Sequence, residues 1–158
     1  MDPRIRFACY KFSPATISGL ISWWTHSLYS HVAIIADGVV YEAIDAGFVR
    51  AITIGENHAK GTLVDIFEYA VPPADWQVNR GIQALEDLVG QKYDFAGIAS
   101  FVTGGRIPES PCRVFCSEAA AIAANAMNKP LQNIAPSSMM PSHVAMSLAL
   151  KFTETITL

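Results

Sequence analysis

The chain has 158 residues, a length typical of one domain, and we interpret residues 1–158 as a single folded unit. Hydrophobic residues make up 51% of the chain and charged residues 16%, a composition that excludes a mainly disordered protein. The formal net charge is -3 and no run of Lys or Arg occurs, so we expect no nucleic-acid partner.

Cellular location is suggested by what the sequence lacks. Residues 1–14 have no continuous apolar run and no small-residue cleavage site, so we predict no signal peptide. No apolar stretch is long enough to span a bilayer, and Val144–Phe152 is interrupted by polar residues. The cysteines, Cys9, Cys112 and Cys116, are odd in number, which leaves at least one thiol free and fits a reducing compartment. We therefore expect a cytoplasmic protein without a membrane span, and we predict no particular oligomeric state.

The first half of the chain favours strands. Residues 16–27 are the exception, because their apolar positions recur at helical spacing. Asp37-Gly38 joins two β-rich runs and favours a type I′ turn, in which both central residues have positive φ. The expected strands are Arg4–Tyr10, the two halves of Ser30–Ala43, Val49–Ile54 and Thr62–Tyr69.

The second half favours helices. Val78–Val89 carries one apolar stripe and is followed by Gly90, a residue that commonly ends helices. After a loop, an Ala-rich helix is predicted over Cys116–Met127, and a last short helix or strand from His143. Because strands come first and long helices follow, we predict an α+β domain rather than alternating βαβ units.

The hairpin brings two chemically active side chains together. If Asp37-Gly38 forms the turn, Ala33 lies opposite Glu42 and His31 lies opposite Ile44. Side chains alternate between the two faces of a strand, so His31 and Glu42 share a face as diagonal neighbours, with Cα atoms about 7–8 Å apart. A carboxylate beside an imidazole fixes its orientation and stabilises its protonated form.

Cys116 is the candidate nucleophile that this pair would serve. The residue opens the Ala-rich helix, directly after the strand-like Arg113–Phe115. A thiol at a helix N-terminus meets unpaired N–H groups and the positive end of the helix dipole, which favour the thiolate. The same N–H groups can stabilise the oxyanion of an acyl transfer reaction.

Four short motifs, in this order, resemble the permuted NlpC-like papain-fold hydrolases of the YiiX/YaeF type. They are Ser30–Ile34, Tyr41–Ala43, Gly90–Phe95 and Phe115–Glu118. The resemblance implies a papain-like antiparallel sheet or barrel packed against helices, with the histidine strand before the cysteine helix. It also implies a Cys–His–acid triad that falls on Cys116, His31 and Glu42, and amide or thioester chemistry on peptide-like or acyl substrates, without a cofactor.

Aromatic residues near the histidine strand are candidates for substrate binding. Trp24 and Tyr29 lie just upstream of His31 and are interpreted as possible walls of a substrate groove. Tyr10 is expected near the site. Each of these aromatics has the alternative role of filling the core, which is the commoner use of such residues.

Other readings of the same residues remain open. Cys116 could be a small buried hydrophobic residue, and His58 is interpreted as a loop residue. His26 and His31 with Cys112 and Cys116 could make a zinc set, but their spacing matches no zinc template, so we predict no metal site. An acyltransferase of the lecithin:retinol acyltransferase kind, or a binding module with an inactive site, are the alternatives to a hydrolase.

Overall fold

The computed structural model of the chain describes residues 4–11, 28–93 and 113–158. Their core element is an open six-stranded sheet in the order β4-β3-β2-β1-β5-β8, in which all neighbouring strands are antiparallel. Its strands are β1 (Ile5–Lys11), β2 (Tyr29–Ala36), β3 (Val39–Ile44), β4 (Gly47–Ala51), β5 (Leu63–Tyr69) and β8 (Leu150–Thr157). The α+β class predicted from the sequence is confirmed. The helix predicted over residues 16–27, including Trp24, falls outside the described residues.

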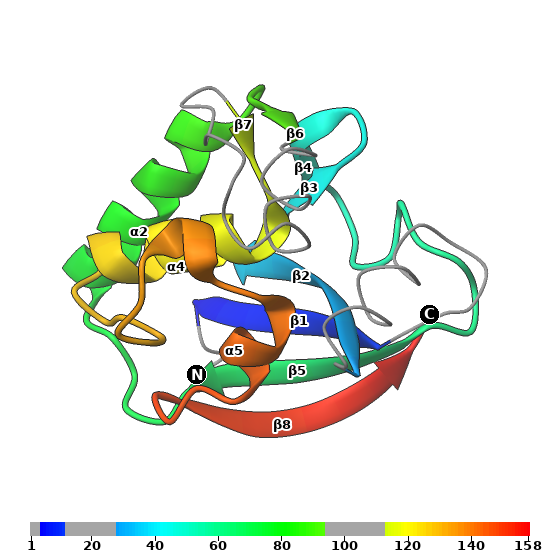
Figure 1. Ribbon diagram of the computed structural model, residues 1–158. Helices are drawn as coiled ribbons and strands as arrows, with labels where there is room; N and C mark the ends of the chain where they lie inside the picture. Colours follow the sequence, from blue (N-terminus) through cyan, green and yellow to red (C-terminus); the bar gives the residue numbers. More distant parts are fainter. Residues whose placement is uncertain (1–3, 12–27, 94–112) are drawn as a thin grey trace.

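Helices cover one face of the sheet, as Figure 1 shows. Helix α4 (Cys116–Ala126) packs on β2 and β3, α5 (Pro141–Ala145) packs on β1 and β2, and α2 (Asp75–Leu88) packs against α4. The buried residues of α4 are mostly alanines, and their small side chains let the helix axis lie close to the strands. The start of α4 is thereby held against the middle of the sheet.

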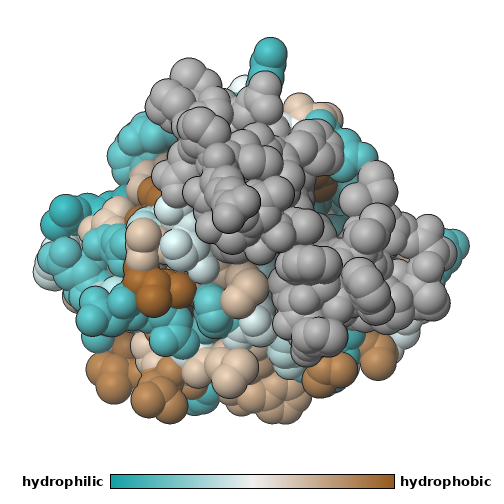
Figure 2. Space-filling view, in the orientation of Figure 1, coloured by the Kyte–Doolittle hydropathy of each residue, from teal (hydrophilic) through white to brown (hydrophobic). Residues whose placement is uncertain are grey.

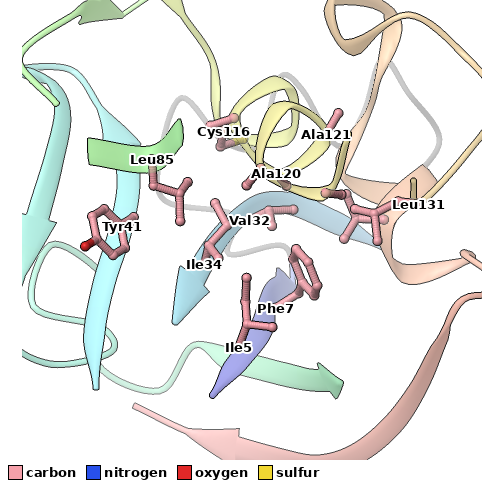
Figure 3. Packing of buried hydrophobic residues seen from close by; sticks show 14 of the residues in the cluster. Ile5, Phe7, Val32, Ile34, Tyr41, Leu85, Cys116, Ala120, Ala121 and Leu131 are labelled. Carbon is pink, nitrogen blue, oxygen red and sulfur yellow. The ribbon is translucent and has the colours of Figure 1, made fainter. Parts of the chain in front are cut away.

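The central strands are buried on both faces. In β1 and β2, Phe7 and Ile34 belong to the cluster beneath the helices, a part of which is drawn in Figure 3. Ala8 and Ile35 belong to a second cluster on the opposite face, which is completed by residues such as Ile156. This double burial explains why apolar residues follow one another almost without interruption in β2, instead of alternating with polar ones.

The predicted hairpin is confirmed in its register. Strands β2 and β3 pair Ala36 with Val39 and Ala33 with Glu42. Asp37 and Gly38 have φ values of 47° and 80°, the positive pair that a type I′ turn requires. The turn therefore sets which side chains of the two strands share a face.

The remaining elements refine the predicted boundaries. Helix α2 begins at Asp75, earlier than predicted, and the Ala74 N–H just before it donates to the side chain of Gln77 at 2.9 Å. The chain end forms both α5 and the edge strand β8, where a single short element was expected. Short elements complete the described chain: the parallel pair β6 (Lys92–Tyr93) and β7 (Arg113–Val114), and the 3-10 helix η1 (Pro136–Ser138).

Exposed apolar side chains occur on the described surface. Met146, Leu148 and Phe152 are examples in or near the C-terminal strand. Figure 2 shows separate brown areas on the face that it draws. None of the helices described for this chain is long and apolar enough to cross a membrane.

Gly47, at the start of β4, supplies a test of this architecture. It has a φ of 123°, and a Cβ added there would lie 2.5 Å from the backbone oxygen of Gln91. Gly61 also has positive φ, but no atom lies within 4 Å of its added Cβ. We expect Gly61→Ala to lower the free energy of unfolding by about 1–2 kcal/mol through backbone strain alone. Gly47→Ala should cost about 1–3 kcal/mol more because of the clash. Equal losses in chemical denaturation would contradict the close approach of β4 to residue 91.

Candidate active site

The candidate site is built around Glu42, a fully buried carboxylate on β3. Its Oε2 atom lies 3.2 Å from Nε2 of His31 and 2.9 Å from Nε2 of His58. Its Oε1 atom accepts a hydrogen bond of 2.7 Å from the side chain of Asn57. Burial raises the pKa of this carboxyl group, but the hydrogen bonds from His31, His58 and Asn57 and the charge on His31 outweigh burial, so the pKa lies well below its usual range. Glu42 is therefore a carboxylate at neutral pH.

His31 stands near the start of β2, in a position set by strand pairing. It pairs with Tyr10 of β1, and pairing of Ala33 with Glu42 puts both His31 and Glu42 on the same face, as predicted. The Tyr10 ring packs edge-on against the His31 ring, with 5.1 Å between centroids. Because Nε2 of His31 is engaged by Glu42, the other ring nitrogen, Nδ1, is left for the sulfur of Cys116.

Cys116 is the first residue of α4 and reaches His31 from the helical side of the sheet. Burial raises the pKa of its thiol. The charge of His31, a hydrogen bond from the His31 ring and the backbone N–H groups of Val32 and Ser117 lower this pKa by more than burial raises it, so the net shift is downward. Burial lowers the pKa of His31, but the sulfur and Glu42 together raise it to about 9. Both shifts favour a thiolate–imidazolium pair.

The start of α4 is fixed by contacts next to the cysteine. The buried Ser117 hydroxyl donates to the backbone oxygen of Met139 at 2.6 Å, which ties the helix to the segment before α5. The Glu118 carboxylate accepts from the Phe115 N–H at 3.4 Å, one half of a capping box. Glu118, a first-turn carboxylate, thus caps the helix on which Cys116 is carried.

Of the other predicted site residues, Tyr10 and Tyr29 lie in the described part of the chain and Trp24 does not. Tyr10 is buried beside the site and stacks on His58, with ring centroids 4.1 Å apart. Tyr29 lies two residues before His31 in β2, and its hydroxyl donates to Asp65 at 2.7 Å. A role for either residue in substrate binding stays a prediction. Trp24, and the His26 and Cys112 of the alternative zinc set, lie outside the described residues.

Two members of the site escaped prediction from the sequence. Asn57 and His58 lie in the turn-rich segment after β4, and both bond to Glu42. The location of His58 in a loop was predicted correctly, but its role was not. The sequence indicates only that these residues follow the expected strand Val49–Ile54. The position of a residue in a loop does not reveal the direction of its side chain.

Comparisons with known proteins add a structural neighbour. No protein-family model and no curated protein matches the sequence at a significant level. The crystal structure of the metalloprotein yiiX from Escherichia coli O157:H7, a DUF1105 protein, is similar to this chain with a TM-score of 0.62. The two share 15% sequence identity over 98% of each chain. The comparison shows a YiiX-like fold, in agreement with that part of the resemblance seen in the sequence.

The ionisation of Cys116 gives a prediction with a defined sign. A folded-state pKa below the ordinary value of about 8.5 means that the thiolate persists as the pH falls below that value. We expect the thiolate absorbance of the native protein, minus that of Cys116→Ser, to persist well below that pH. In His31→Gln the same signal should move to higher pH, because burial then acts without the opposing charge.

Cys9 is the internal reference for this titration. Burial, with the charges of Cys116 and Asp65, raises the pKa of the Cys9 thiol, so Cys9 contributes no thiolate signal near neutral pH. A Cys116 titration at or above the ordinary thiol pKa would contradict the ion pair.

Proposed function

We propose that this protein is a cysteine-dependent hydrolase that cleaves amide or thioester bonds of peptide-like or acyl substrates. The observation that carries the proposal is the line from Cys116 through His31 to Glu42, in which the sulfur and the carboxylate bond to one imidazole ring. A nucleophile, a base and an orienting acid in hydrogen-bond sequence are the arrangement that thiol-dependent acyl transfer requires.

The reaction follows from the charges on these groups. The Cys116 thiolate attacks the substrate carbonyl carbon, and the His31 imidazolium gives its proton to the departing amine or thiol. Neutral His31 then takes a proton from water, whose oxygen attacks the acyl-enzyme, and release of the acid restores the ion pair. Throughout, Glu42 holds the ring orientation and stabilises its positive charge.

The helix start also offers electrostatic stabilisation. As the first residue of α4, Cys116 carries a backbone N–H that has no acceptor four residues back within the helix. In acyl transfer, such a donor beside the nucleophile is suited to the oxyanion of the tetrahedral intermediate. We assign this role to the Cys116 N–H.

The order of the site in the chain supports a permuted papain-like arrangement. His31 and Glu42 come from an early hairpin, and Cys116 opens a later helix that packs on the same strands. This order matches what the resemblance to permuted NlpC-like hydrolases implies. The YiiX-like fold is compatible with that assignment, and the nature of the bond that is cleaved is decided by experiment.

Trapping of an acyl-enzyme tests the proposal. Purified protein is incubated with a panel of peptide amides, muropeptides, acyl thioesters and phospholipids, and the intact mass is followed. We expect an adduct on Cys116 with at least one class, no adduct in Cys116→Ala, and acylation slowed by about 10²–10⁴-fold in His31→Gln.

Cys9→Ala is the matched control. Cys9 is a buried thiol on β1, next to the strand that carries His31, and it takes no part in the proposed reaction. Its adduct yield should equal that of the native protein. An adduct that survives Cys116→Ala would contradict the proposal. A full panel without adducts would favour the non-catalytic binding module, and transfer of the acyl group to an added amine or alcohol in preference to water would favour the acyltransferase.

A further inference from the structure

His58 is a titratable residue at the site to which the proposed hydrolysis gives no role. Cys116, His31 and Glu42 suffice for nucleophile, base and orienting group, yet a second imidazole points at the same carboxylate oxygen. The His58 ring is held in place by stacking on Tyr10. The backbone N–H of His58 is also fixed, by a hydrogen bond of 2.9 Å to the oxygen of Gly55. Such fixed placement of a loop histidine on a buried carboxylate calls for a physical explanation.

We propose that His31, Glu42 and His58 form a binding site for a divalent transition-metal ion of the zinc class. One ligand atom from each residue lies within 4.8 Å of the other two. The two imidazole Nε2 atoms lie 3.2 Å and 2.9 Å from the same oxygen of Glu42. Ligand atoms around a tetrahedral zinc ion lie about 3.3 Å apart, so small side-chain shifts would bring all three onto one ion.

The chemistry of the donor set selects the class of metal. Two imidazole nitrogens and one carboxylate oxygen suit zinc, cobalt, nickel or ferrous iron, whereas calcium and magnesium prefer oxygen ligands alone. Three protein ligands leave a further position open to water or a small ligand. The His58 side chain is 19% exposed, which gives an ion a route to the otherwise buried cluster.

Further hydrogen bonds hold two of these ligands in place. Asn57 donates to Oε1 of Glu42, which fixes the carboxylate and leaves Oε2 directed at the two histidines. The His31 ring is also hydrogen-bonded to Cys116, and because Nε2 points at Glu42, Nδ1 is the nitrogen left for the sulfur. Metal-bound imidazoles usually have such a hydrogen-bond partner on their second nitrogen. The sulfur is therefore an outer partner in this proposal and not a ligand.

Metal occupancy and the Glu42-oriented form of His31 exclude each other. An ion on Nε2 of His31 replaces the proton that this nitrogen shares with Glu42. The site would then exist in two states, one with a proton and one with a metal ion between the same side chains. This inference rests on the ligand geometry and does not require that the proposed hydrolysis is correct.

The experiment is a metal titration of the purified, chelator-treated full chain. Zinc sulfate is titrated by calorimetry, and cobalt chloride is titrated while the visible absorption spectrum is recorded. We expect one tight site per chain, undetectable in His58→Gln and about 10–100-fold weaker in Asn57→Ala, where only the outer shell is lost. Magnesium and calcium chloride should give no binding.

Two variants make the test specific. His143→Gln removes a histidine of α5 outside the cluster and should leave the affinity unchanged. Cys116→Ser should keep the site, and the cobalt spectrum should lack a thiolate charge-transfer band. Absence of binding, retention of full affinity in His58→Gln, or a thiolate band that vanishes in Cys116→Ser would each overturn the proposal. All of these readouts are binding measurements, so they can fail while acyl-enzyme formation succeeds, or succeed while it fails.

Discussion

A single buried carboxylate organises the described site. Glu42 is fully buried, and an ionised carboxylate without partners would cost several kcal/mol in such surroundings. Its charge is satisfied by His31, His58 and Asn57, which come from β2 and from the segment after β4. The fold can therefore keep Glu42 only if these elements are correctly placed, and the same requirement aligns His31 toward the start of α4. Stability and site geometry depend on one set of hydrogen bonds.

The part of the site that sequence reasoning recovered is the part governed by local rules. A two-residue turn fixes strand register, so Asp37-Gly38 alone placed Ala33 opposite Glu42 and His31 on the same face. The start of an Ala-rich helix after a short strand identified Cys116 as its first residue. Contact between Cys116 and His31 is long-range. It followed from the chemistry of the residue types and the family resemblance, and the structure brings the two together through packing of α4 on β2.

What the sequence did not reveal depends on non-local geometry. His58 and Asn57 reach Glu42 because β4 pairs with β3 and the chain then turns back toward the sheet, a path that no periodicity records. The sequence left the chain end open between a helix and a strand, because β8 lies at the sheet edge, where most of its side chains are exposed and its apolar pattern is weak. In both cases the structure is decided by contacts with another strand, β3 for the loop residues and β5 for β8.

We infer that His31 is a doubly protonated ring held between a thiolate and a carboxylate. Nitrogen-15 NMR of the imidazole in metal-free protein measures this directly, because the shifts of Nδ1 and Nε2 report which atoms carry protons. We predict that both nitrogens of His31 are protonated at neutral pH, and that Cys116→Ala lowers the pKa of the ring by removing the charge that raises it. A His31 ring that is neutral at that pH in the native protein, or whose pKa is unaffected by Cys116→Ala, would contradict the account.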